Sequence, residues 1–204
     1  MSKPRLYGIP ASRALRSIWA IEEVGIDYEL VPTHFLGDSK KPDYVAINPN
    51  GRIPTLVDGD VTLFESMAIN LYLAKKYGDG LYPGDPTAEA LTWQWSFWGM
   101  TEIEPSLMKM VLHKMMLPED QRDTSVVEQA ENDIQRPLKV LDAHLADREY
   151  LLGGSFGIAD LNVASVLGMS AFVGYDFSSF ANARRWFSAC EARPSLARAQ
   201  KAGS

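Results

Sequence analysis

Two short stretches contain residues whose types and spacing could bind a small peptide. The first is Ile53-Pro54, at the start of a β-prone run. A cis peptide bond before Pro54 would turn the Ile53 backbone N–H and C=O away from strand pairing. These groups could then pair with an extended peptide as an added strand. Because most X-Pro bonds are trans, an ordinary proline at a strand start is the competing interpretation.

The second stretch is Glu65-Ser66, at the expected start of a helix from Met67 to Tyr77. A helix N-terminus offers unpaired N–H groups and a partial positive charge, so it attracts a carboxylate. Glu65 could hold an ammonium group, and the two features together would bind the charged head of a free amino acid. The competing interpretation is an ordinary Ser66 N-cap beside a solvated Glu65.

The elements that position these stretches follow from local patterns. Residues 48–51, Asn-Pro-Asn-Gly, form a cluster of turn residues. Two β-prone runs, 55–57 and 61–64, flank Asp58-Gly59-Asp60, a composition typical of a hairpin turn. A ββα unit is therefore predicted.

The first 31 residues predict a βαβ unit. A short strand at 5–8 is followed by a helix that ends near Val24, and residues 28–31 form a second strand. Ser12 is the candidate N-cap of the helix. Because a strand, a helix and a strand in this order imply a parallel pair, the N-terminal region has the thioredoxin-like plan, βαβ followed by ββα.

The spaced pattern NPxGxIPxLxDGxxxLxES over residues 48–66 resembles the glutathione-binding half of cytosolic glutathione S-transferases. The resemblance extends over the whole N-terminal segment, and we assign it to the bacterial-type, serine-class-like members. It implies glutathione as co-substrate and no metal.

The resemblance also assigns roles to individual residues. In the family, the residue that matches Ile53 pairs with the cysteinyl backbone of glutathione, beside a cis-proline that matches Pro54. The residues that match Glu65 and Ser66 hold the γ-glutamyl head, and the one that matches Arg52 lies beside the glutathione backbone.

Ser12 matches the residue that activates the thiol in many of these transferases. A thiol reacts as the thiolate, and an unperturbed cysteine has a pKa near 8.5. A hydroxyl that donates to the sulfur favours the anion, and Arg13 or Arg16 would add positive potential. Two alternatives stay open: Ser12 only caps the helix, or backbone N–H groups from Ala11 to Arg13 hold the thiolate.

The connector at 33–47 contains a further candidate. In relatives, the matching segment often provides a basic residue for the glycyl carboxylate of glutathione. Lys40 is preferred and Lys41 is the alternative, although a solvated charged loop explains both equally well. His34, a lone histidine, predicts no metal site.

Composition shifts predict two domains. Residues 1–77 form the thioredoxin-like, glutathione-binding domain, and the Gly-, Pro- and Asp-rich segment 78–86 is a linker. Residues 87–204 form an all-helical domain with the acceptor-substrate pocket. Its predicted helices span 88–116, bent near Pro105, then 125–147, kinked at Pro137, and 158–173, 179–192 and 195–201.

The long helix at 88–116 is rich in tryptophan and methionine, which core and dimer packing would largely explain. Since this helix forms the acceptor pocket in relatives, we expect Met108 and His113 to lie on its wall. Further along, Gly157 replaces the hydroxyl residue of a capping box that the family carries, so only Asp160 of the box remains.

The predicted function is a glutathione transferase that activates the thiol for addition to, or substitution on, apolar electrophiles, as in detoxification. The alternatives are a non-catalytic glutathione-fold interaction module or a glutathione-dependent peroxidase or isomerase. A dithiol cycle is excluded because the chain has no CxxC motif. The resemblance also implies a homodimer, with Phe64 near the subunit interface.

Composition is consistent with this function. The chain has 204 residues, 46% hydrophobic and 23% charged, as in soluble globular proteins. The first 77 residues are neutral, so the rest carries the whole net charge of -6, and no basic face suggests nucleic acid. No apolar run has transmembrane length, and the N-terminus lacks a signal-peptide core. With a single cysteine, a cytoplasmic location is expected.

Overall fold

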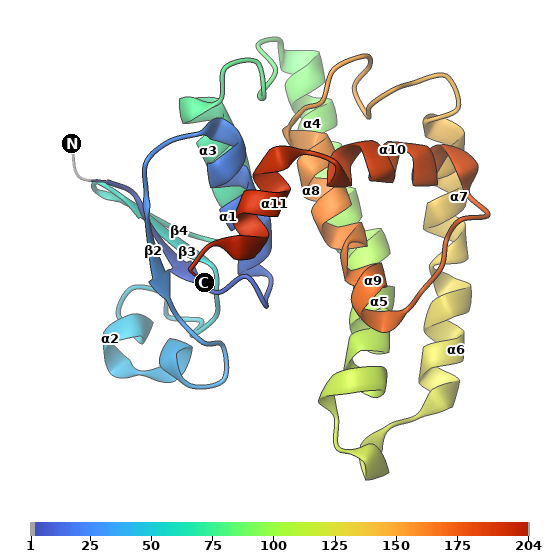
Figure 1. Ribbon diagram of the computed structural model, residues 1–204, viewed down its shortest axis with the longest axis horizontal. Coiled ribbons are helices and arrows are strands. Elements are labelled where there is room, and N and C mark those ends of the chain that lie inside the picture. Colours follow the sequence, from blue (N-terminus) through green and yellow to red (C-terminus); the bar gives the residue numbers. More distant parts are fainter. Residues whose placement is uncertain (1–2, 204) are drawn as a thin grey trace. The chain divides into compact units, whose positions relative to one another are not determined.

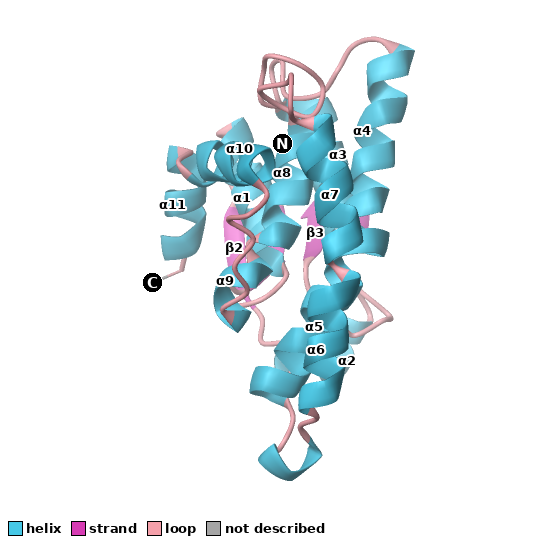
Figure 2. Cartoon of the chain, turned by 90° about the vertical axis from the view of Figure 1, so that its right-hand side faces the viewer, coloured by secondary structure: helices cyan, strands magenta, loops and turns pink. Residues whose placement is uncertain are grey.

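The computed structural model describes residues 3–203, which form two compact units. The first unit comprises the chain up to Pro83 together with the segment from Arg193, and the second is Gly84–Ala192. In the described chain, strands occur only in the first unit, while the second consists of helices and loops (Figure 2). The segment from Arg193 was predicted within the helical domain; it packs with the first unit instead.

A four-stranded sheet of order β2-β1-β3-β4 forms the centre of the first unit. β1 runs parallel to β2 and antiparallel to β3, and β3 is antiparallel to β4. This arrangement confirms the predicted thioredoxin-like fold. The strands are β1 (Arg5–Gly8), β2 (Glu29–Pro32), β3 (Thr55–Asp58) and β4 (Val61–Phe64).

Three helices of the first unit lie together on one side of this sheet (Figure 1): α1 (Ala14–Val24), α3 (Ser66–Tyr77) and α11 (Pro194–Lys201). Apolar side chains from both layers meet in a core, where Leu6, Leu56 and Ile18 have no exposed surface. Burial of this kind stabilises the unit by roughly 1.5–3 kcal/mol per large aliphatic side chain. Two short helices, η1 (Asp38–Lys40) and α2 (Pro42–Val45), occupy the connector between β2 and β3.

Charge pairing explains why α11 belongs to the first unit. Arg193 Nε donates to Glu23 Oε2 at 3.0 Å, Ser195 donates to the same carboxylate, and Arg198 Nε donates to Glu22 at 2.8 Å. Burial alone would raise the pKa of Glu23, but the bonds from Arg193 and Ser195 outweigh it and hold that pKa below its usual value. The two adjacent acidic residues near the end of α1 thus bind the start of the last helix.

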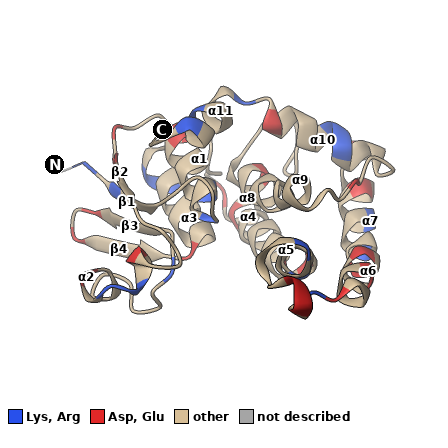
Figure 3. Cartoon of the chain, turned by 60° about the horizontal axis from the view of Figure 1, so that its bottom comes forward, with Lys and Arg blue, Asp and Glu red and all other residues tan. Residues whose placement is uncertain are grey.

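The second unit is helical throughout. Its elements are α4 (Pro86–Trp98), η2 (Gly99–Ile103), α5 (Glu104–Val111), η3 (Leu112–Met116), η4 (Glu119–Gln121), α6 (Thr124–Asp133), α7 (Gln135–His144), α8 (Ile158–Leu167), α9 (Met169–Val173) and α10 (Ala181–Glu191). Acidic residues are prominent on the turn between α5 and α6 (Figure 3), where Glu119 and Asp120 form part of η4.

Prolines divide the long predicted helices. Pro105 has no N–H to donate, and the turn before it widens into the π-helical segment η2. The second long helix was predicted to be kinked at Pro137, but it is broken into two helices. In a continuous helix the Pro137 ring would clash with the carbonyl of Asp133, four residues earlier, and α6 ends at Asp133. Gly168 separates α8 from α9. Among residues 3–203, no helix is sufficiently long and apolar to span a membrane.

Asp160 fixes the start of α8 from inside the core. The carboxylate accepts the N–H groups of Leu151 and Gly157 at 2.8 and 2.9 Å, and the indole N–H of Trp186 at 2.7 Å. Burial raises the pKa of Asp160, and these three bonds oppose the rise. The Asp160 part of the capping box, which the sequence predicts, is therefore present, and its role is structural.

Candidate functional site

The site is built where β1 ends. Gly8 has a φ of +154°, and a Cβ at this position would lie 2.3 Å from the Ala14 Cβ and 3.9 Å from the Ile53 Cβ. Since real Cβ atoms do not approach to 2.3 Å, only glycine allows this packing. The first turn of α1 and the Ile53 loop therefore meet beside the last residue of β1.

Ser12 lies in the loop between these elements and is partly exposed. Its hydroxyl donates to the Ile9 carbonyl at 2.7 Å and accepts the Ala14 N–H at 3.1 Å. The helix begins at Ala14, so Arg13 and not Ser12 occupies the N-cap position, and the Arg13 side chain makes no capping bond. The predicted N-cap is one residue early because Ser12 and Arg13 form a turn before the helix.

The Ile53–Pro54 peptide bond is cis, as the resemblance implied. The Ile53 side chain is buried, with 9% exposure, whereas Arg52 is exposed. In the described part of the chain, the backbone N–H and C=O of Ile53 have no hydrogen-bond partner. Both groups can therefore pair with an extended peptide.

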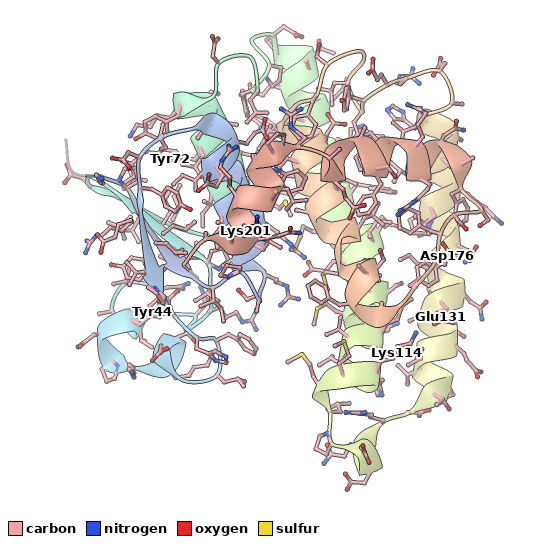
Figure 4. All side chains as sticks on the ribbon, viewed as in Figure 1. Tyr44, Tyr72, Lys114, Glu131, Asp176 and Lys201 are labelled. Carbon is pink, nitrogen blue, oxygen red and sulfur yellow. The ribbon has the colours of Figure 1, made fainter. Side chains whose placement is uncertain are left out.

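A buried polar network holds this loop in place. Tyr44 of α2, labelled in Figure 4, donates its hydroxyl to the Arg52 carbonyl at 2.6 Å, and Asn48 Nδ2 donates to the same carbonyl at 2.8 Å. Both side chains also contact the Thr55 hydroxyl, at 2.7 and 3.0 Å. Burial raises the pKa of Tyr44, which keeps the phenol protonated. From the sequence, Asn48 was predicted only to form a turn, and Tyr44 was not predicted to have a role. The spacing of four residues between them was the signal that could have placed the two side chains together.

The second candidate binding element is the start of α3. The helix begins at Ser66, so the prediction of Ser66 as N-cap is wrong: Glu65 takes that position, with φ 72° and no capping bond from its side chain. The chain turns sharply from β4 into the helix at Glu65, which brings the helix start forward by one residue. The first helical bond runs from Ile69 N–H to the Glu65 carbonyl. The N–H groups of residues 66–68 therefore have no partner within the helix.

Ser66 itself is buried, with 5% exposure, and in the described chain its hydroxyl has no hydrogen-bond partner. Its carbonyl accepts a long bond, 3.5 Å, from the Ser17 hydroxyl of α1. The start of α3 is thus tied to the helix that follows Ser12. The structure brings Ser12, Ile53, Glu65 and Ser66 into one unit around neighbouring element ends.

The two candidate lysines differ in their contacts. Lys40 Nζ donates to the Gly51 carbonyl at 2.5 Å, whereas Lys41 is paired with Asp38 at 2.7 Å. Lys41 also lines a hollow of about 280 Å³ with Tyr7 and Tyr44, but Ser12 and Ile53 do not line it. Lys40 is therefore the lysine that lies against the Ile53 loop.

Met108 and His113 belong to the second unit and are partly exposed. His113 lies in η3, and its Nδ1 accepts the Asp123 N–H at 3.1 Å, which ties the end of this helix to the loop before α6. Lys114 next to it donates to Glu131 at 2.9 Å (Figure 4). Within residues 3–203, no group of three histidine, cysteine or acidic side chains is arranged to hold a metal ion.

Comparison with known proteins identifies the family. The model of the glutathione S-transferase N-terminal domain matches residues 2–75, and the model of the C-terminal domain matches residues 103–194. Glutathione S-transferase 3 of Zea mays is 39% identical over 80% of this chain and 77% of its own length. A glutathione S-transferase of Hyoscyamus muticus is 34% identical over 96% of both chains.

Solved structures agree with these relatives. A theta class glutathione S-transferase of Xanthomonas axonopodis pv. citri, solved with glutathione bound, has a TM-score of 0.89 at 30% identity and covers 98% of this chain and 97% of its own. Glutathione S-transferase III in its apo form has a TM-score of 0.84 at 34% identity, with 98% and 97% coverage. With both domain models matched in order and a relative aligned over nearly its full length, the chain belongs to the glutathione S-transferase family.

Proposed function

We propose that this glutathione transferase binds its co-substrate on the first unit and activates the thiol with Ser12, as a serine-class enzyme. The chain is a transferase of the glutathionyl group. The main supporting observation is the convergence at Gly8: a backbone with free pairing groups at Ile53 lies beside the helix that follows Ser12.

Binding is proposed to use two sets of contacts. The cysteinyl backbone of glutathione pairs with Ile53, beside Pro54 and Arg52, as a short added strand. The γ-glutamyl head is held by its two charges: its carboxylate at the N-terminus of α3 and the Ser66 hydroxyl, and its ammonium by Glu65. The free N–H groups of α3 and the partnerless Ser66 hydroxyl support this assignment.

Thiol activation is proposed to use the Ser12 proton. In the structure this proton is donated to the Ile9 carbonyl, so rotation about the side chain must redirect it to the bound sulfur. The Ala14 N–H bonded to the Ser12 oxygen supports donation, because a hydroxyl that accepts a bond donates more strongly. Arg13 at the helix start adds positive potential near the developing thiolate.

The second unit is proposed to provide the acceptor pocket for an apolar electrophile, with Met108 and His113 on its wall. Methionine adapts to ligands of varied shape, and Met115 and Met116 near His113 are half exposed. The chain is further proposed to form a homodimer in the cytoplasm. Exposed apolar side chains on β4 and α4 support this assembly, namely Phe64 (40%) and Phe97 (63%). A monomer in light scattering at micromolar concentration would contradict the dimer.

The Ser12→Ala variant tests the mechanism. Loss of a hydrogen bond to a charged sulfur removes about 1.5–3 kcal/mol of thiolate stabilisation, which corresponds to a rise of roughly one to two units in the pKa of the bound thiol. Turnover of an aryl halide at neutral pH should fall about ten- to a hundredfold, while affinity for glutathione stays nearly constant. The measurement is an ultraviolet titration of the thiolate in the glutathione complex.

An unchanged titration in Ser12→Ala would assign the thiolate to backbone N–H groups between Ala11 and Arg13. Retention of the wild type on immobilised glutathione without turnover of aryl halide or peroxide would contradict the enzymatic proposal and favour an interaction module.

A further inference from the structure

We infer that the hollow between β1, β2 and the connector at 33–47 is a binding site for a small aromatic amine that is protonated at neutral pH. Its volume of about 280 Å³ is close to the lower end of small-molecule sites. None of the residues that the proposed function assigns to glutathione or to its thiol lines this hollow, so the two sites are separate. Its lining residues are Tyr7, Val31, Pro32, Thr33, Asp38, Lys41, Asp43, Tyr44 and Ile47.

The pleat of β1 sets the position of Tyr7. Successive residues of a strand face opposite sides of a sheet. Leu6 is fully buried in the core beneath the helices, so Tyr7 faces the other side, beside its β2 partner Val31. Tyr7 is 8% exposed, and in the described chain its hydroxyl has no hydrogen-bond partner. Because a buried phenol normally has a partner, this hydroxyl is available to a ligand in the hollow.

The charged lining residues contain one acidic residue in excess. Lys41 Nζ is paired with Asp38 at 2.7 Å, so these two charges balance each other. Asp43, at the start of α2, is exposed, and within residues 3–203 its carboxylate has no ion pair. The unbalanced carboxylate attracts a cation and repels an anion.

The aromatic side chains of the hollow favour a ligand with a ring. The rings of Tyr7 and Tyr44 lie edge to face, with their centres 5.9 Å apart. The Tyr44 hydroxyl is already bonded to the Arg52 carbonyl (Tyr44 is labelled in Figure 4), so Tyr44 contributes only its ring to a ligand. The Arg5 guanidinium, which does not line the hollow, lies 5.9 Å from the centre of the Tyr7 ring. A second cation is therefore better placed at the Tyr7 hydroxyl than over this ring.

These features define the binding mode. The ring of the amine packs against the tyrosine rings and the aliphatic side chains of Val31 and Ile47. Its ammonium donates to the Asp43 carboxylate and to the oxygen of the Tyr7 hydroxyl, since an ammonium has three donors and a phenol oxygen can accept. A ligand with a single ring has few atoms, so the expected dissociation constant is about millimolar.

The experiment is a nuclear magnetic resonance titration of the isotope-labelled protein with benzylamine, benzyl alcohol and benzoate. The three probes share one ring and differ in charge, which is positive, zero and negative. Benzylamine should cause saturable shifts of the Val31, Thr33 and Ile47 amide signals, with an affinity about two- to fivefold higher than that of benzyl alcohol. Benzoate should bind more weakly than either, and glutathione should leave the benzylamine shifts unchanged.

Asp43→Asn removes the unbalanced charge, and Asp60→Asn is its matched control, because Asp60 is an exposed acidic residue outside the hollow. Asp43→Asn should weaken benzylamine binding about two- to fivefold and leave benzyl alcohol binding unchanged, whereas Asp60→Asn should change neither. Tyr7→Phe retains the ring and should weaken benzylamine binding about three- to tenfold. Its midpoint of urea denaturation should equal that of the wild type, because the hydroxyl has no partner in the free protein.

Tighter binding of benzoate than of benzylamine would overturn the inference, as would benzylamine shifts confined to Ile53, Glu65 and Ser66. Equal losses in Asp43→Asn and Asp60→Asn would show a general effect of charge and would also overturn it. Wild-type affinity in both Asp43→Asn and Tyr7→Phe would remove the two groups from any site. Since the titrations need no bound glutathione, the result does not depend on the Ser12 mechanism or on the proposed glutathione site.

Discussion

Two helices of the second unit, α4 and α6, have starts that are closed by an acidic N-cap side chain. Asp85 accepts the N–H groups of Thr87 and Ala88 at the start of α4, both at 3.0 Å. Asp123 accepts the Ser125 N–H at 2.8 Å at the start of α6. In both cases an acidic residue before the helix satisfies N–H groups that would otherwise need a partner.

The starts of α1 and α3 in the first unit differ: the Ser12 hydroxyl accepts the Ala14 N–H at 3.1 Å, whereas the start of α3 is left open. The N-cap positions of α1 and α3 are Arg13 and Glu65, and neither side chain forms a capping bond. Ser66 does not close its helix either, although serine is a good N-cap. A capped start stabilises the fold and leaves fewer N–H groups for a ligand. The open start of α3 is therefore the place at which we expect an anion to bind.

The largest expected effect follows from Asp160→Asn, which breaks a closed start within the core. Asparagine retains one acceptor oxygen, and its NH₂ group would face an N–H donor from Leu151, Gly157 or Trp186. A buried group left without its partner costs about 3 kcal/mol or more. Urea denaturation should show this loss in the free energy of unfolding, with glutathione affinity of the folded protein unchanged. A loss below about 1 kcal/mol would mean that Asp160 does not support the core.

Glu65→Ala tests an open start. Removal of the carboxylate should weaken glutathione binding about tenfold, because one charge-assisted contact to the ammonium is lost, and should shift the thiol pKa little. Glu65→Gly should bind as weakly, but it should be more stable than Glu65→Ala by about 1 kcal/mol, because glycine adopts a positive φ without strain. Calorimetric titration and chemical denaturation measure the two effects. Wild-type affinity in both variants would remove Glu65 from the site.

Asp85→Ala opens a closed start and should have the converse effect. Loss of the cap of α4 should lower the free energy of unfolding by about 1 kcal/mol and leave glutathione affinity unchanged. Asp85→Ser serves as the control, since serine retains a capping oxygen. If Asp85→Ala weakened glutathione binding as much as Glu65→Ala, the distinction between closed and open starts would fail.

The smallest effect concerns pH. Bonds from the Ser125 hydroxyl and N–H hold the pKa of Asp123 below its usual value. Since the folded pKa lies below the unfolded one, the stabilisation is present above about pH 4, the unfolded pKa, and is lost as pH falls through the folded pKa. The protection factor for hydrogen exchange at the start of α6, which is normalised to the intrinsic exchange rate at each pH, should fall over this acid range. Asp123→Ser should remove this pH dependence, and a fall that persists in that variant would assign it to another group.

The sequence alone determined the features that depend on residues close together in the chain. The spaced pattern from Asn48 to Ser66 predicted the turn, the hairpin and the helix that follows it. With the preceding βαβ pattern it led to the thioredoxin-like plan. Turn residues and helix periodicity encode such units because the contacts that stabilise them lie within a few residues.

Only the tertiary structure decided the details of the site. Lys40 contacts the Ile53 loop through its bond to the Gly51 carbonyl, whereas Lys41 is paired with Asp38. Where α3 starts depends on how the chain leaves β4 at Glu65.

The last helix shows the same limit over a longer distance. The sequence predicted a helix at 195–201, which corresponds to α11. It did not predict that this helix packs with the first unit, because the bond between Arg193 and Glu23 joins residues 170 positions apart. A local pattern specifies an element and its apolar face. Its partner is selected by side chains that meet only after the chain has folded.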